Sequence, residues 1–148
     1  MDADTGGRLR GVITKLSRQL NASAAGEGLT PSQASALGLI AFRGPLSLAE
    51  LASIEGLNPT MVSRIVGKLD DSRLIRRVAD ANDMRRASVE VTPDGDQLNE
   101  LIKSKRGASV AEAFNRLTPD EQESVLSALS ALESLAKELG RKPHNGSR

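Results

Sequence analysis

The first notable feature of this chain is the set of residue types that it lacks. It contains no Cys, no Trp and no Tyr, and it has only two Phe residues (Phe42 and Phe114) and one His (His144). Without Cys there is no disulfide, thiol redox sensor, Cys nucleophile or Cys-ligated metal. A single His near the C-terminus excludes a His-rich zinc site and argues against a Ser-His-Asp triad. Two Phe residues do not form an aromatic platform for single-stranded nucleic acid.

Long apolar runs and a strong net charge are also missing. The longest apolar stretch covers residues 36–42, which is too short to span a membrane. The first ten residues are polar and charged, so we expect no secretory signal and predict a soluble cytoplasmic protein. The 148 residues suit one domain, or one domain with a short dimerising extension. Taken alone, the net charge of +1 argues against nucleic acid or a membrane as partner.

Proline residues mark where helices begin. Four of the six Pro residues directly follow a Thr or Asn, as in Thr30-Pro31, Asn58-Pro59, Thr92-Pro93 and Thr118-Pro119. This pair is typical of a helix start, because the first side chain accepts a hydrogen bond from a free backbone N–H and Pro has no N–H to leave unpaired. Glu or Gln three residues later adds capping boxes at Thr30, Ser47 and Thr118. With an amphipathic stretch at 5–25, these signals predict six helices.

Strand signals occur in one part of the chain. Residues 74–78 and 87–91 flank a polar turn at 80–83, and the second segment alternates apolar and polar residues. We therefore expect a mainly α fold with one β-hairpin wing, namely a winged helix-turn-helix with N- and C-terminal dimerisation helices. The predicted regions are a helical dimerisation region at 5–29 and 108–139, a winged helix-turn-helix at 30–107 whose long helix from 93 bridges to the dimerisation region, and a disordered tail at 140–148.

Residues 47–72 have the pattern of a helix-turn-helix. A short helix at 47–54 and a tight turn at 55–58 precede a second helix that begins at Pro59. The apolar face of the second helix carries Val62, Ile65, Val66 and Leu69. Its polar face carries Thr60, Ser63, Arg64, Gly67, Lys68 and Asp71. This polar face could reach base edges and phosphates, with Gly67 allowing close backbone approach, but a solvated face with an incidental Gly fits the pattern equally well.

The hairpin carries four Arg residues close to its turn. Arg76 and Arg77 precede the turn, and Arg85 and Arg86 follow it. Beside a candidate recognition helix, these side chains suit phosphate contact or insertion into a narrow minor groove. The alternative is an ordinary charged turn in which Asp83 pairs with Arg85 and Arg76. The position directly after a helix-turn-helix favours the DNA interpretation.

The charge of the chain is unevenly distributed. Residues 58–86 contain seven basic and four acidic residues, whereas residues 108–139 contain two basic and six acidic residues. The near-zero total therefore combines a basic segment that suits DNA with an acidic C-terminal region that we expect to face away from it.

Several stretches of the sequence resemble the MarR family of transcriptional regulators. They are Leu29 to Gln33, Leu46 to Ala52, Asn58 to Val66, and above all Asp80 to Ala87 running into Val91 to Gly95. The stretch 80–87 is similar to the wing of the family with its Asp-x-Arg signature, here Asp83 and Arg85. Met84 departs from the pattern, since an Arg is common there. The likeness covers about residues 8–139.

The resemblance implies a homodimeric winged-helix repressor or activator that binds a pseudo-palindromic DNA site. It also implies that Asp83 fixes and presents Arg85 of the wing. Many family members respond to small amphipathic, often phenolic, ligands in a cleft between the dimerisation and DNA-binding regions. The branches of the family that sense oxidants through Cys or zinc through His do not match a chain with no Cys and no His outside its tail.

The first and last helices carry apolar seams that independently indicate a dimer. The seam residues recur at spacings of three and four, which is typical of coiled-coil packing. They are Leu9, Ile13, Leu16 and Leu20 in the first helix and Val125, Leu129, Leu132, Ala136 and Leu139 in the last. Packing within one chain is the alternative, but the winged helix forms its own core and leaves these seams little else to cover them. A two-fold dimer would place two recognition helices roughly 34 Å apart.

These observations predict a sequence-specific DNA-binding transcriptional repressor that is a homodimer and not an enzyme. We assign major-groove contacts to Pro59, Thr60, Ser63, Arg64 and Lys68, and wing contacts to Asp83, Arg85 and Arg86. The predicted partners are double-stranded DNA, a second copy of the chain and a small-molecule effector, with no membrane, metal or cofactor.

The effector and the function each have an alternative. Polar anchors for an effector could come from Arg18, Arg43, Ser35 or Ser47, but the absence of any physiological ligand fits the sequence equally well. The alternative function is a helical protein–protein interaction module without specific DNA binding.

Overall fold

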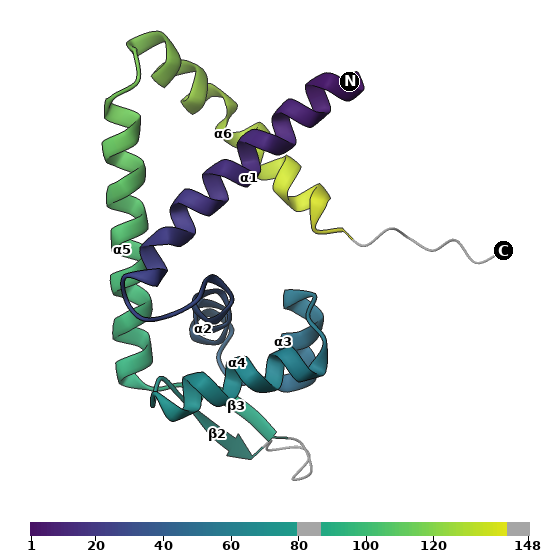
Figure 1. Cartoon of the computed structure of the whole chain (residues 1–148), viewed down its shortest axis with the longest axis vertical. Helices are drawn as coiled ribbons and strands as arrows, with labels where there is room; N and C mark the ends of the chain where they lie inside the picture. The colour runs from purple at the N-terminus through teal and green to yellow at the C-terminus, as the bar shows by residue number, and fades with distance from the viewer. Residues whose placement is uncertain (80–86, 142–148) are drawn as a thin grey trace, which may run out of the picture. The chain divides into compact units, whose positions relative to one another are not determined.

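The computed structural model describes residues 1–79 and 87–141, which form six helices and three strands. The elements are α1 (Ala3–Ala25), α2 (Pro31–Arg43), β1 (Leu46–Ser47), α3 (Leu48–Glu55), α4 (Pro59–Asp71), β2 (Ile75–Ala79), β3 (Ala87–Val91), α5 (Pro93–Asn115) and α6 (Pro119–Leu139) (Figure 1). The chain divides into two compact units, Met1–Ser109 and Val110–Arg148. Within the described ranges, no helix is long and apolar enough to cross a membrane.

The six predicted helices are all present, and their starts are capped as the sequence indicates. The capping boxes at Thr30, Ser47 and Thr118 are complete, each with reciprocal hydrogen bonds between side chain and backbone. The side chain of Asn58 caps α4 by accepting a hydrogen bond of 2.9 Å from the backbone N–H of Met61. Each cap satisfies a backbone donor that the first helical turn leaves free, and is worth about 1 kcal/mol.

The sheet contains a third strand that is not predicted from the sequence. The strand β1 is two residues long and pairs antiparallel with β3, so the sheet order is β1-β3-β2. Two residues are too few to show an alternating pattern, and Leu46 and Ser47 have the sequence of a helix entry. The predicted hairpin of β2 and β3 is confirmed, and it places Arg76 directly opposite Glu90.

The core lies between α2, α3, α4, the sheet and the first half of α5, all in the Met1–Ser109 unit. Its largest fully buried side chains are Leu37, Ile40, Leu51, Leu69, Ile75, Ile102, Val62, Val66 and Val89. The apolar face predicted for α4 is confirmed, because all four of its side chains are buried. Burying a side chain of this size is worth roughly 1.5–3 kcal/mol, so the core fixes which face of α4 points outward.

The seam residues predicted for α1 and α6 remain accessible in the single chain. No residue of α6 is buried, and Val125, Leu129, Leu132 and Leu139 are all exposed. In α1, Ile13 and Leu16 are exposed, while Leu9 and Leu20 are half-buried. The division into dimerisation and DNA-binding regions stays a prediction. The tail prediction falls mainly on residues 142–148, which lie outside the described residues.

Candidate nucleic-acid interface

The polar face of α4 is turned away from the core. The five residues predicted to contact the major groove are all exposed, namely Pro59, Thr60, Ser63, Arg64 and Lys68. Among the described residues, neither Arg64 nor Lys68 takes part in an ion pair. Both cations are therefore available to an external anion. We call this surface the outer face of α4.

Gly67 lies on the same helix, and its environment bears on why a poor helix former is there. A Cβ added at Gly67 would have no heavy atom within 4 Å, apart from the backbone of its own helix. Packing inside this chain therefore does not require a glycine at this position. Because Gly in mid-helix costs about 1 kcal/mol relative to Ala, an external partner that approaches the backbone closely would account for it.

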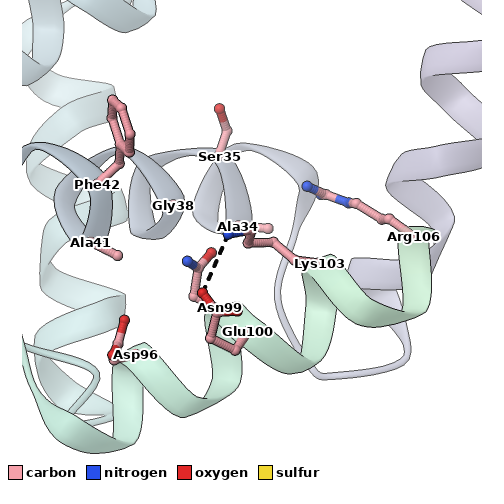
Figure 2. Close-up of a pocket in the computed structure, with 10 residues that line it drawn as sticks. All are labelled: Ala34, Ser35, Gly38, Ala41, Phe42, Asp96, Asn99, Glu100, Lys103 and Arg106. Atoms are coloured by element: carbon pink, nitrogen blue, oxygen red, sulfur yellow. Dashed lines mark hydrogen bonds and ion pairs between the residues drawn. The ribbon is translucent and has the colours of Figure 1, made fainter. Parts of the chain in front are cut away.

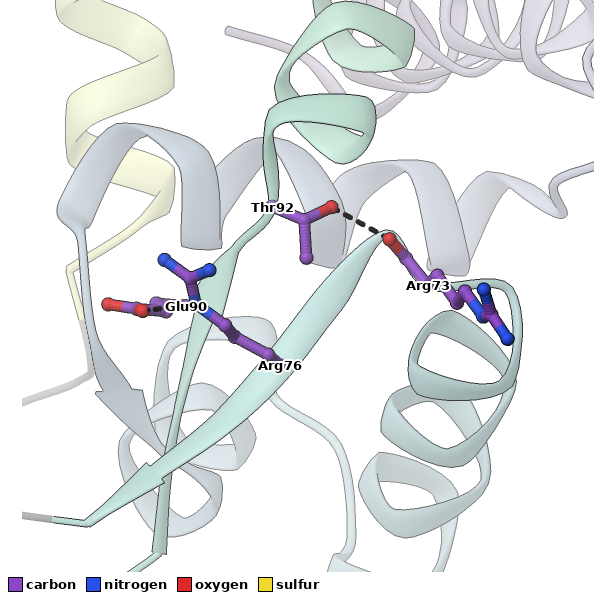
Figure 3. A network of polar contacts seen from close by, with 4 residues as sticks. All are labelled: Arg73, Arg76, Glu90 and Thr92. Atoms are coloured by element: carbon purple, nitrogen blue, oxygen red, sulfur yellow. Dashed lines mark hydrogen bonds and ion pairs between the residues drawn. The ribbon is translucent and has the colours of Figure 1, made fainter.

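The base of the wing carries Arg76 and Arg77, and both have carboxylate partners. The guanidinium of Arg76 donates to Glu90 on the neighbouring strand at 2.5 Å (Figure 3). Arg77 lies 3.5 Å from Asp70 near the end of α4. Both Arg side chains are more than half exposed, so these pairs orient the side chains more than they stabilise the fold. Arg77 thereby connects the wing to α4.

The remaining predicted wing residues cannot be placed. Asp83, Arg85 and Arg86 lie outside the described residues, and so does the alternative pairing of Asp83 with Arg85 and Arg76. Their contribution to DNA binding stays a prediction.

The end of α4, the start of β2 and the start of α5 are joined by a compact set of contacts. Arg73 has a left-handed backbone (φ 58°), and its carbonyl accepts a hydrogen bond of 2.7 Å from the hydroxyl of Thr92 (Figure 3). The same hydroxyl oxygen accepts from the N–H of Gly95 at 3.1 Å. The N–H of Thr92 donates to the carbonyl of Leu74 at 3.0 Å. We call Arg73, Leu74, Thr92 and Gly95 the α4–α5 junction.

Gly95 is the tightest point of the α4–α5 junction. A Cβ on Gly95 would lie 1.9 Å from the carbonyl oxygen of Leu74, which no side chain could tolerate without movement. The sequence predicts Thr92 only as a helix cap, and its contact with the Arg73 carbonyl is a further role. The signal that was available is the combination Thr-Pro-x-Gly, in which a cap is followed three residues later by a residue without a side chain.

A cavity of about 490 Å³ lies between α2 and α5, within the Met1–Ser109 unit. Figure 2 shows its lining, with Ala34, Ser35, Gly38, Ala41 and Phe42 from α2 and Asp96, Asn99, Glu100, Lys103 and Arg106 from α5. Of the residues suggested as effector anchors, only Ser35 lines it, and its hydroxyl donates to Glu55 at 3.0 Å. The α5 residues could not be predicted as part of a cavity, because they meet α2 only in the fold.

Two polar groups in this cavity stand out. Asn99 is buried, and its side chain lies between the two helices (Figure 2). The Nε atom of Arg106 is buried and has no hydrogen-bond partner within the described part of the chain, although its Nη2 reaches Asn21 at 3.4 Å. Buried polar groups are usually satisfied, so an incompletely paired Arg beside a cavity indicates space for an external acceptor.

The architecture defines a class of protein. The helices α2, α3 and α4 are followed by an antiparallel wing, and α4, the second helix of the helix-turn-helix, has an exposed polar face. This arrangement is a winged helix-turn-helix, which is a DNA-binding fold. Residues 27–86 match the MarR family. The helix-turn-helix part of the chain is therefore similar to the MarR family, and the curated relatives that it matches are named HTH-type transcriptional regulators.

Individual relatives support this assignment. The chain is 26% identical over 113 residues to the HTH-type transcriptional repressor MdtR of Bacillus subtilis (strain 168), covering 76% of this chain and 73% of MdtR. It is similar to the crystal structure of YusO from Bacillus subtilis, with a TM-score of 0.70, 26% identity and coverage of 91% and 94% of the two chains. A Staphylococcus aureus MepR mutant bound to an oligodeoxyribonucleotide has the same fold, with a TM-score of 0.66, 21% identity and coverage of 89% and 97%.

Proposed function

We propose that this chain is a homodimeric, cytoplasmic transcriptional repressor that binds a pseudo-palindromic operator. The observation that carries the proposal is the outer face of α4, where Arg64 and Lys68 are exposed opposite a fully buried apolar face. Pro59, Thr60 and Ser63 lie in the first turns of α4, where a recognition helix contacts base edges. Asp83, Arg85 and Arg86 would act in the adjacent minor groove. The name of the relative MdtR supports repression.

The exposed seams support a homodimer. Leu129 and Leu132 of α6, like Leu16 of α1, are about half exposed in the single chain, at 52%, 44% and 58%. Each of the two long helices thus leaves apolar side chains in contact with water, which packing against a second copy would cover. A two-fold arrangement presents two recognition helices to successive major grooves, and this matches a site made of two half-sites.

The test is selection of bound sites from genomic DNA, followed by titration of two variants against the selected site. We expect Arg64→Ala to weaken binding by about 10- to 100-fold and to relax sequence preference at one position per half-site, since Arg reads guanine bidentately. We expect Lys68→Ala to weaken binding to all sequences alike and to reduce the salt dependence. Arg116→Ala, which removes an Arg from the acidic C-terminal region, is the matched control and should leave binding unchanged.

Two results would contradict the proposal. If no sequence is enriched, or if Arg64→Ala binds the selected site as tightly as wild type, the outer face of α4 does not read DNA. The protein–protein interaction module is then the better description of the chain.

We further propose that a small amphipathic ligand in the cavity between α2 and α5 releases the operator. The cavity combines apolar Ala41 and Phe42 with the incompletely paired Arg106, so it suits an aromatic or aliphatic body with an acidic group. Benzoate and alkyl carboxylates serve as probes in a titration of the protein–operator complex. Release that is abolished by Arg106→Met supports the site, whereas equal release from the variant, or no release by any probe, contradicts it.

A further inference from the structure

One exposed residue of α4 does not share the polar character of its neighbours. Met61 lies in the first turn of the helix, and its side chain is 43% exposed. The next two residues of the core pattern, Val62 and Ile65, are buried. Met61 belongs neither to the buried core cluster nor to the half-buried apolar residues packed against that cluster. It is therefore not needed to fill the core of this chain.

The helical register places Met61 beside the two cations of the outer face. Arg64 and Lys68 follow it by three and seven residues, so the three side chains are neighbours along one side of α4. The backbone N–H of Met61 donates to the capping side chain of Asn58 at 2.9 Å, which fixes where the helix begins and hence where Met61 points. An apolar group thus lies at the N-terminal end of a basic strip.

The chemistry of the major groove offers one apolar group at the base edges, the 5-methyl group of thymine. A Met side chain is flexible and polarisable, and it adapts its shape to such a contact without needing a hydrogen-bond partner. We propose that Met61 is a specificity-determining residue that contacts the methyl group of one thymine in each half-site of the operator. This inference rests on the proposed function, because it requires that α4 enters the major groove.

The experiment removes only the methyl group from the DNA. Each thymine of the selected operator is replaced in turn by deoxyuridine, and binding is titrated with wild type, Met61→Ala and Met61→Leu. For wild type we expect one thymine per half-site at which deoxyuridine weakens binding by about fourfold. When both half-sites are changed, binding should weaken by about 15-fold. These factors correspond to the free energy of burying one methyl group per contact. Met61→Ala should bind the thymine and deoxyuridine operators equally well at that position, while Met61→Leu should keep the preference.

Combining the Met61 substitutions with the deoxyuridine substitutions isolates the contact between them. If deoxyuridine weakens binding only by altering the DNA itself, it does so equally for every protein variant. The matched control is Ile54→Ala on α3, an apolar residue of similar exposure at 46%, which should retain the full thymine preference. Circular dichroism of each variant confirms that it is folded.

Four outcomes are decisive. Loss of the thymine preference in Met61→Ala and its retention in Met61→Leu support the inference. Two outcomes overturn the role of Met61 and leave the proposed function intact. In the first, wild type binds the operator selectively but equally well with deoxyuridine at every position. In the second, Met61→Ala retains the preference for thymine. Absence of any selective DNA binding overturns the proposed function and this inference together.

Discussion

Replacing Gly95 by Ala is the sharpest test of how the α4–α5 junction is built. The added Cβ would lie 1.9 Å from the carbonyl oxygen and 2.8 Å from the carbonyl carbon of Leu74. Close C···O contacts in proteins are about 3.3 Å or longer, so the Leu74 peptide or the first turn of α5 has to move by about 1.4 Å. The atoms in the way belong to the backbone, and no side-chain rotation relieves the clash.

The size of the effect follows from three contributions. Overpacking of this kind costs about 1–3 kcal/mol. The movement also disrupts the hydrogen bond of 3.0 Å from the N–H of Thr92 to the carbonyl of Leu74, which adds about 1 kcal/mol. The better helix propensity of Ala returns at most about 1 kcal/mol. We therefore expect Gly95→Ala to lower the free energy of unfolding by about 2 kcal/mol.

Urea unfolding followed by far-ultraviolet circular dichroism measures this change, at one fixed protein concentration because the proposed dimerisation would shift apparent stability. With a slope of about 2 kcal/mol per molar urea, the midpoint falls by about 1 M. Gly107→Ala in the same helix is the matched control, since nothing lies within 4 Å of its added Cβ. That variant should unfold at the same or a higher urea concentration. The reasoning is refuted if Gly95→Ala is as stable as wild type.

Three further predictions follow from individual contacts. Gly67→Ala should raise the free energy of unfolding by up to about 1 kcal/mol yet weaken operator binding in a titration; unchanged binding would make the glycine incidental. Thr92→Val removes the hydroxyl bonded to the Arg73 carbonyl at 2.7 Å, and urea unfolding should show a loss of about 1–2 kcal/mol that Thr92→Ser largely restores. Hydrogen bonds from the backbone and hydroxyl of Thr118 lower the pKa of Glu121. The stabilisation by this carboxylate is therefore present above the ordinary Glu pKa and lost as the pH falls through the lowered one, so the difference in thermal stability between wild type and Glu121→Gln should shrink in acid; a difference that does not change with pH would contradict this.

The features that could be predicted from the sequence are those set by residues close together in the chain. A capping box joins residues three apart, so Thr30, Ser47 and Thr118 could be assigned before any fold was known. The two faces of α4 follow in the same way from helical periodicity. Once the apolar side must be buried, Arg64 has to point outward, and the structure confirms that it is exposed.

The features that could not be predicted depend on residues far apart in the chain. The strand β1 exists only because Leu46 lies opposite Val89 in the folded sheet. From the sequence, Gly95 is only a residue of low helix propensity in the first turn of a helix. In the fold, the carbonyl of Leu74 lies so close to it that a side chain does not fit. From the sequence, Met61 is one more apolar residue of an amphipathic helix. Its exposed fraction in the structure shows that it is not part of the core.

The proposed binding mode, with α4 in one groove and the wing in the next, requires a fixed spacing between them, and contacts at the wing base connect the sheet to both helices of the helix-turn-helix. Ser47 caps α3 and pairs with Ser88 of β3, so the first helix of the helix-turn-helix is tied to the sheet. Arg77 of β2 pairs with Asp70 of α4 at 3.5 Å, which ties the second helix to the same sheet. The ion pair is too exposed to add much to the free energy of unfolding. Its effect is to hold the wing base against α4 before DNA is present, so that binding loses less conformational entropy than it would with a freely moving wing.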